Sequence, residues 1–160
     1  MTAETTSAPD AGPAGEVGPT TDQPAGQTGA DIITEFLKHS PYVAHLGMQL
    51  VTLAPDRAEI LMPFRSELIT IGDMVHGGAI ASLVDTTAMA ASWSTPKPPE
   101  NLRGTTVGFS LNFLAGARST DLTGRATVIQ RGRNLCVADV DVVDPDGRLI
   151  AKGLVTYKLG

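Results

Sequence analysis

The stretch MVHGGAIASLVD, residues 74–85, brings together residue types that could do carbonyl chemistry. His76, Gly77 and Gly78 stand directly before a run of small apolar residues, and Asp85 follows nine positions after the histidine. A helix beginning here would present unpaired backbone N–H groups and the positive end of its dipole to an oxygen gaining negative charge. The stretch therefore indicates an oxyanion-binding helix start, accompanied by a carboxylate that could act as base or nucleophile.

The same residues also have structural interpretations, which the spacing alone leaves open. Glycine lets a reacting group approach the backbone because it has no Cβ, but it also lets a loop bend and a helix pack closely. Asp85 is the carboxylate of a helix rich in small residues, where it could equally be a solvent-facing charge.

Residues 76 to about 94 form the long helical pattern that would position this chemistry. One arc of about 80° on this helix contains Ile80, Leu83, Val84, Thr87 and Ala91. Asp85 lies away from that arc, beside Ser82 and Met89. The many alanines would let a sheet approach closely, and STPKPPEN ends the helix.

Strand patterns lie on both sides of this helix. Residues 46–64 alternate around APDR, which predicts a hairpin. Four strands follow the helix, in GTTVGFSLNFLA, TDLTGRATVIQ, NLCVADVDVVD and RLIAKGLVTYKL, with turns at RGRN and PDG. In the first of the four, the alternation places on one face Val107, Phe109, Leu111 and Phe113.

The order of elements predicts an α+β fold, with an antiparallel sheet of about six strands against one long helix. A short helix precedes them in DIITEFLKHSP, with Asp31 as its N-cap and Pro41 at its end. One helix covers little more than one sheet face, so we expect a second subunit against the remaining surface or edge.

Composition limits the remaining possibilities. Residues 1–29 are Ala, Gly, Pro and Thr-rich and predict a disordered tail, leaving residues 30–160 as one domain. The net charge of −5 argues against a nucleic-acid partner. The single cysteine cannot form an intramolecular disulfide, and the three histidines lack close metal-ligand spacing with a carboxylate, apart from His39 with His45, so we expect no metal site. No apolar run is long enough to cross a membrane, and no signal peptide is recognisable, which predicts a cytoplasmic protein.

The stretch VHGGAIASLVDTTAMAAS, with two strands before it and four after, resembles the PaaI-like branch of the hotdog-fold acyl-CoA thioesterases, relatives of 4-hydroxybenzoyl-CoA thioesterase. The resemblance runs from about residue 40 to 158 and includes TTVGFSLNFLAGA and GRLIAKGLVTYKL. It implies a sheet wrapped around a central helix, and a homodimer with a continuous sheet, often paired into a homotetramer. It further implies hydrolysis of a coenzyme A thioester at the dimer interface, without metal or organic cofactor.

The resemblance assigns roles to individual residues. Gly77 matches the residue whose backbone N–H faces the thioester carbonyl, and Asp85 matches a carboxylate base or nucleophile supplied by the partner chain. His76 matches a histidine that organises the loop rather than transferring a proton. Thr70, six residues before His76, departs from the family, where many members carry Asn or Gln that orients the water or contacts the thioester. A threonine hydroxyl is shorter and has one hydrogen to donate.

Three outcomes of this departure stay open. Thr70 could take over the role with altered geometry, a neighbour such as Glu67 or Asp73 could contribute, or activity could be low. The family also uses a Ser or Thr for support, either one turn beyond the carboxylate, where this chain has Met89, or from the partner chain. The candidates for the second position are Thr105, Thr106 and Ser110.

Other residues are candidates for binding substrate. Gly78 lies beside the expected oxyanion donor, and Met62, Met74, Met89 and Trp93 could line a fatty or aryl acyl site or simply pack in the core. Surface arginines that could meet the phosphates of coenzyme A are Arg103, Arg118, Arg131 and Arg133. Two alternatives to hydrolysis are a non-catalytic acyl-CoA binding module, and a hydratase or dehydratase, whose usual pattern the His-Gly-Gly loop does not follow.

Overall fold

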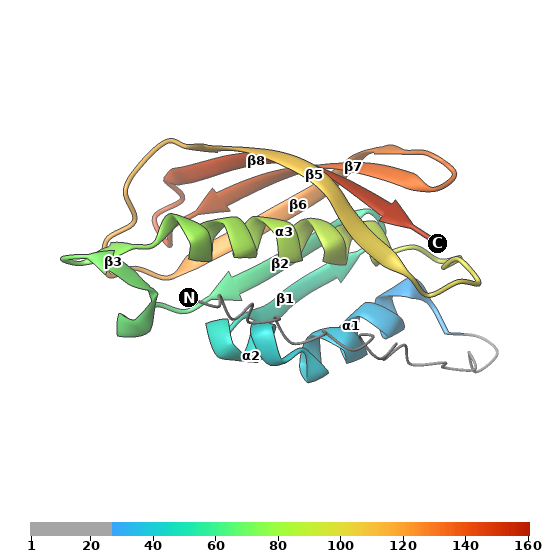
Figure 1. Ribbon diagram of the computed structural model, residues 1–160, viewed down its shortest axis with the longest axis horizontal. Coiled ribbons are helices and arrows are strands. Elements are labelled where there is room, and N and C mark those ends of the chain that lie inside the picture. Colours follow the sequence, from blue (N-terminus) through green and yellow to red (C-terminus); the bar gives the residue numbers. More distant parts are fainter. Residues whose placement is uncertain (1–26) are drawn as a thin grey trace, which may run out of the picture.

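Six strands form one antiparallel sheet in the order β1-β2-β6-β7-β8-β5 in the computed structural model, which describes residues 27–160 (Figure 1). Their bounds are β1 Gln49–Ala54, β2 Arg57–Met62, β5 Gly104–Phe113, β6 Leu122–Arg131, β7 Leu135–Val143 and β8 Leu149–Leu159. The expected disordered tail lies, up to residue 26, outside the described residues. The predicted hairpin at APDR is confirmed, because β1 and β2 pair across Pro55 and Asp56.

The long helix α3 (Gly77–Trp93) lies across one face of the curved sheet (Figure 1). Its predicted core-facing arc is buried, and the helix is also covered on flanking positions such as Ala88 and Ala90. Gly124 and Gly153 permit this contact, because a Cβ on either would stand 2.5 or 2.7 Å from a side-chain atom of α3. The expected α+β fold, a six-stranded antiparallel sheet around one central helix, is confirmed.

Two helices precede the sheet, where the sequence predicted one. α1 (Gly29–His39) begins three residues earlier than expected, because its N-cap is Thr28 rather than Asp31. Asp31 occupies the third helical position and completes a capping box with Thr28. Pro41 does not only end α1: it opens α2 (Pro41–Leu46), because proline is well suited to a first helical turn.

The start of α1 is fixed on the end of α3. The Gly29 N–H donates to Thr95 O at 2.9 Å. A Cβ on Gly29 would stand 1.9 Å from Trp93 O, so only glycine fits between the two backbones. The first helix is therefore part of the domain, close to the C-terminal half of α3.

A short hairpin leads into α3. A turn of 3₁₀ helix (Ser66–Leu68) is followed by β3 (Ile69–Ile71) and β4 (Met74–Val75), which pair with each other. The His76 N–H donates to Leu68 O at 2.7 Å, so this hairpin holds the first residues of α3 in place.

β5 forms one edge of the sheet and contains a β-bulge between Thr106 and Gly108. The prediction that Val107, Phe109, Leu111 and Phe113 share one face of this strand is correct for the last three residues only. Phe109 and Phe113 lie opposite the buried Val155 and Ala151 and share their face, as Leu111 does, whereas Val107 is the extra residue of the bulge. Phe109 is nevertheless 47% exposed and Phe113 is 55% exposed, so the edge carries uncovered apolar surface.

Candidate active site

The first turn of α3 leaves one backbone donor free. His76 is the N-cap, and its Nδ1 accepts a hydrogen bond from Gly78 N–H at 2.7 Å. Ala79 N–H and Ile80 N–H both donate to His76 O. Within residues 27–160, nothing accepts a hydrogen bond from Gly77 N–H. Because Nδ1 accepts from a backbone N–H, the neutral ring of His76 carries its proton on Nε2.

Gly77 lines an apolar cavity of about 410 Å³. Phe113 forms one wall, with its ring 3.3 Å from the position that a Cβ on Gly77 would take. Thr70 lines the same cavity and is exposed. A carbonyl oxygen entering this cavity would meet a free N–H at the positive end of a helix of 17 residues.

Asp85 is half-buried in the middle of α3 and has a hydrogen-bond donor in its own chain. Thr106 Oγ1, on β5, donates to Asp85 Oδ1 at 2.6 Å. Asp85 comes eight positions after Gly77, which corresponds to about 12 Å along a helix at 1.5 Å per residue. One thioester carbonyl therefore cannot contact both groups of the same chain.

The other threonine and serine candidates do not reach the carboxylate. Ser110 pairs with Leu154, on the sheet face away from α3. Thr105 lines a separate cavity of about 280 Å³ with Arg103 and Lys158. Of the three candidates from sequence, Thr106 is thus the one that contacts Asp85.

The two proposed substitutes for the missing Asn or Gln are both engaged elsewhere. Glu67 does not line the Gly77 cavity, and hydrogen bonds from its own backbone N–H and from Ser66 hold its pKa below the usual value. Asp73 accepts a hydrogen bond from Arg118 at 2.5 Å. This leaves Thr70 as the polar side chain of the cavity.

The candidate arginines for phosphate binding differ in whether their guanidinium groups already pair with residues of this chain. Arg131 donates to Asp56 Oδ1 at 2.7 Å and to Ser92 O at 2.9 Å, so it fixes the β1–β2 turn against α3. Arg118 is paired with Asp73 but is exposed. Arg133 is exposed beside a cavity of about 250 Å³ at the C-terminal end of α3.

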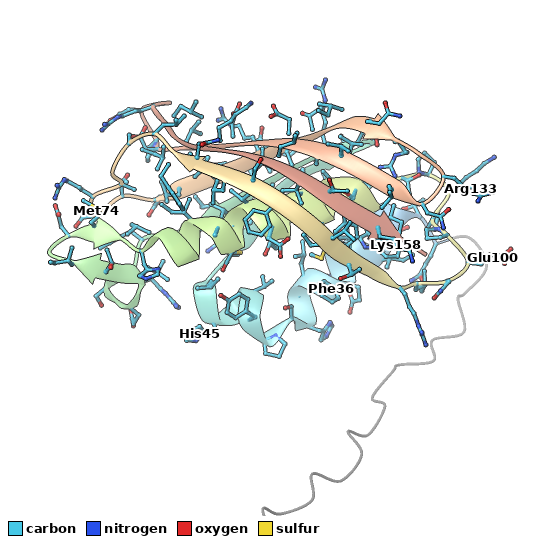
Figure 2. All side chains as sticks on the ribbon, turned by 45° about the horizontal axis from the view of Figure 1, so that its top comes forward. Phe36, His45, Met74, Glu100, Arg133 and Lys158 are labelled. Atoms are coloured by element: carbon cyan, nitrogen blue, oxygen red, sulfur yellow. The ribbon has the colours of Figure 1, made fainter. Side chains whose placement is uncertain are left out.

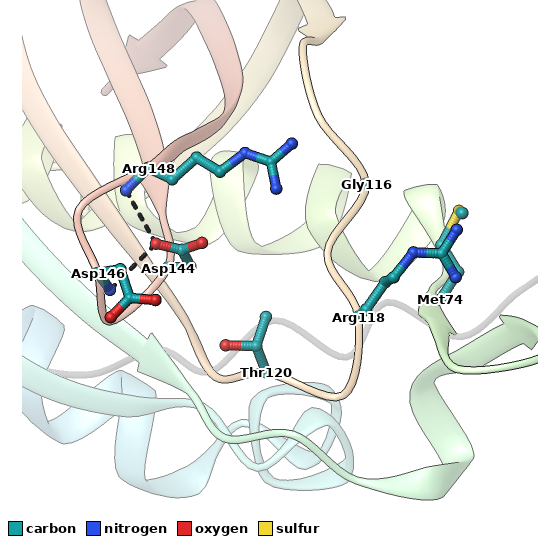
Figure 3. Close-up of a pocket in the computed structure, with 7 residues that line it drawn as sticks. All are labelled: Met74, Gly116, Arg118, Thr120, Asp144, Asp146 and Arg148. Atoms are coloured by element: carbon teal, nitrogen blue, oxygen red, sulfur yellow. Dashed lines mark hydrogen bonds between the residues drawn. The ribbon is translucent and has the colours of Figure 1, made fainter.

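A cavity of about 490 Å³ adjoins the Gly77 cavity and shares Met74 and Gly116 with it. Arg118 and Arg148 line it from different loops (Figure 3). Sequence reasoning missed Arg148, although it directly follows the turn residues PDG. Asp144 Oδ1 accepts hydrogen bonds from the backbone N–H groups of Asp146 and Arg148, and the Arg148 side chain extends from this turn along the cavity (Figure 3).

In the part of the chain that the structure describes, no three His, Cys, Asp or Glu side chains are grouped as metal ligands would be. None of its helices combines the length and apolar character needed to cross a bilayer.

Comparison with known proteins places this arrangement in a family. The model described as the thioesterase superfamily matches residues 72–151, half of the chain, including His76–Asp85 and β5. A thioesterase family protein from Silicibacter pomeroyi is 30% identical, with a TM-score of 0.76 over 82% of this chain and 99% of that one. The chain belongs to the thioesterase superfamily, as its motif predicts.

Two more distant structures support the fold. The PaaI protein from the phenylacetic acid degradation operon of Escherichia coli is 19% identical, with a TM-score of 0.72 over 82% of this chain and 94% of that one. A hypothetical thioesterase from Streptococcus pneumoniae, crystallised with coenzyme A, is 22% identical, with a TM-score of 0.64 over 71% and 86%. At these identities the likeness concerns the hotdog fold.

Proposed function

We propose that this protein hydrolyses acyl-CoA thioesters at two equivalent sites of a homodimer. The observation that carries the proposal is the free Gly77 N–H in an apolar cavity, within a domain of the thioesterase superfamily. The coenzyme A bound by the S. pneumoniae thioesterase supports a CoA thioester as substrate.

The separation of Gly77 and Asp85 within one chain supports the dimer. The ten-residue strand β5 is an edge of the sheet, and it carries the exposed apolar side chains of Val107, Phe109 and Phe113. An edge strand with unpaired backbone groups and exposed apolar side chains is suited to pairing with another strand. Pairing of β5 with β5 of a second copy would bring Asp85 of one subunit toward the Gly77 cavity of the other.

In the proposed reaction, Gly77 N–H donates to the thioester oxygen and stabilises the negative charge that develops there. Such a donor lowers the barrier by about 2.7–4 kcal/mol. If Asp85 of the partner subunit acts as base, it takes a proton from water as the water attacks the carbonyl carbon, the C–S bond breaks, and Asp85 returns that proton to the leaving thiolate of coenzyme A. If Asp85 acts as nucleophile, it attacks the carbonyl carbon, the C–S bond breaks to release the thiolate, and water then hydrolyses the acyl-Asp85 anhydride, which yields the free acid and a proton for the thiolate and restores the carboxylate. Thr106 keeps the carboxylate oriented.

The coenzyme A moiety would extend from Gly77 over Gly116 into the adjoining cavity. Arg148 and Arg118 would meet its phosphates there, although the same cavity also contains Asp144 and Asp146. We propose no metal or organic cofactor, because a backbone N–H and a carboxylate supply the polarisation and the base.

The presence of Thr70, where many relatives carry Asn or Gln, favours a second candidate function, a non-catalytic acyl-CoA binding module. One experiment separates the two. The pure protein is incubated with short, medium, long and aromatic acyl-CoAs, and thiol release and binding are both measured. Thiol release supports the hydrolase, whereas binding across the panel with no release supports the binding module.

A further inference from the structure

An apolar cavity of about 190 Å³ lies between α1, the C-terminal half of α3 and the sheet, away from the Gly77 cavity. It is lined by Ile32 and Phe36 of α1, Met89 and Trp93 of α3, and Tyr157 of β8. In Figure 2, Phe36 on α1 lies well apart from Met74, which marks the Gly77 end of the helix. The cavity is therefore a separate space in the same domain.

This cavity adjoins Asp85. Met89 is one helical turn beyond Asp85, so both side chains lie on the same face of α3. Gly104, which also lines the cavity, is two positions before Thr106, the residue that donates to Asp85. Burial is the main cause that raises the pKa of Tyr157, and the nearby Asp85 carboxylate raises it further.

The lining suits an apolar group of limited size. Trp93, Tyr157 and Phe36 are three of the seven aromatic residues in the chain. The polar groups of the first two are paired, because Trp93 Nε1 donates to Tyr157 OH at 3.2 Å. A cavity of about 150 Å³ with an apolar lining can accommodate benzene. About 190 Å³ thus corresponds to one ring with a short linker, or to a chain of about six carbons.

We propose that this cavity binds the acyl group of the substrate and that Phe36 of α1 limits its size, so that the enzyme prefers compact apolar acyl groups over long fatty chains. The inference rests on the proposed hydrolysis. The acyl group would enter beside Asp85 of the subunit whose α1 forms the cavity, while the thioester carbonyl is held by Gly77 of the other subunit. The selecting helix, residues 29–39, lies outside the segment matched by the family model.

Phe36 is suited to a test because it is 52% exposed, so replacing it removes little core packing. The full-length protein is assayed with acetyl-, hexanoyl-, 3-phenylpropanoyl-, decanoyl- and palmitoyl-CoA. The wild type is expected to hydrolyse hexanoyl- or 3-phenylpropanoyl-CoA with a higher kcat/KM than palmitoyl-CoA, and the comparison of these two compact substrates distinguishes chain from ring.

Two substitutions at Phe36 should change selectivity in opposite directions. Phe36→Ala enlarges the cavity and should raise the ratio of kcat/KM for decanoyl-CoA to that for hexanoyl-CoA about tenfold, since pocket contacts with one or a few methylenes are worth that much. Phe36→Trp should lower the ratio. Ile129→Ala, which truncates a 60% exposed side chain on β6, is the matched control and should leave the ratio unchanged.

The outcomes separate this inference from the proposed function. Hydrolysis with an unchanged ratio in both Phe36 variants, or a wild-type preference for palmitoyl-CoA, overturns the acyl cavity and leaves the thioesterase intact. No hydrolysis of any acyl-CoA overturns the proposed function, and the inference with it. If one Phe36 variant fails to fold, the ratio in the other decides.

Discussion

The two halves of α3 differ in what they offer to a substrate. The N-terminal half presents a free backbone N–H, an exposed threonine and a cavity that continues between loops. The C-terminal half is packed by α1 and encloses a smaller space lined by aromatic rings. Asp85 lies between them, bound to Thr106.

We interpret this difference as two separate roles along one helix, carbonyl polarisation at its start and acyl binding near its end. Charge development is best stabilised at the helix start, where backbone donors are unpaired, and an apolar group is best bound where rings exclude water. Because Gly77 and Asp85 of one helix are too far apart to contact the same carbonyl, the proposed site combines the start of one helix with the middle of the helix of a second subunit.

The largest effect is expected from removing the carboxylate. Asp85→Asn should lower kcat by at least about a hundredfold, since general base catalysis contributes that much or more, with little change in melting temperature. Thiol release from hexanoyl-CoA and a thermal melt measure the two quantities. Turnover close to that of the wild type would contradict the role of Asp85.

Loss of the helix-start donor should be nearly as severe. Gly77→Val places a branched side chain against Phe113 and over the backbone N–H, so kcat should fall about a hundredfold. Retained melting temperature and dimer mass would show that the loss is chemical. An unchanged kcat would argue that the carbonyl binds elsewhere.

The separation of the two half-sites can be tested by mixing these variants. If each site combines Gly77 of one subunit with Asp85 of the other, heterodimers of Gly77→Val and Asp85→Asn contain one intact site. Co-refolding equal amounts should then restore about a quarter of wild-type activity, since half of the dimers are mixed. No recovery, with mixed dimers verified by mass, would place both groups in one subunit's site.

Removing the N-cap should have a smaller effect on stability. His76→Ala frees Gly78 N–H and should lower the free energy of unfolding by about 1 kcal/mol, whereas His76→Asn should retain most of it because asparagine also caps well. Denaturant unfolding measures both. Equal stability of the two variants would show that the Nδ1 contact contributes little.

The smallest effect concerns pH at the far end of α3. The pKa of Tyr157 is raised above its ordinary value of 10.0, so its stabilising contribution is complete below about pH 10 and is lost as pH rises through the higher native pKa. Tyr157→Phe should therefore lose less stability than the wild type between pH 9 and pH 11. The measurement is the free energy of unfolding against pH, and parallel curves would contradict it.

Local sequence patterns were enough to predict the central helix, most of the strands and the residues at the helix start. The apolar spacing from Ile80 to Ala91 defined the central helix, and the turn residues separated the strands. The motif around His76 predicted both the helix start and the family. These features depend on near neighbours in the chain, which the sequence displays directly.

Some features that the sequence analysis missed are local. Thr28 as a cap and Pro41 as a helix start follow known preferences, but Pro41 was expected only to end the first helix, and the second helix was not predicted. The other missed features depend on contacts between distant segments. The choice of Thr106 over Thr105 and Ser110 depends on a bulge that no residue type announces. Arg148 and the α1 cavity become visible only when loops and helices come together in space.

The bulge at Val107 has a consequence for how relatives should align. It shifts the phase of β5 by half a period, so that Thr106 and Phe113, seven positions apart, face the same side. A relative without the extra residue would keep the pairing on either side of it, and would place the equivalents of these two residues six positions apart. When such a relative is aligned with this chain, we therefore expect a one-residue gap in the relative directly after the position of Thr106, provided that it keeps the equivalents of both Thr106 and Phe113.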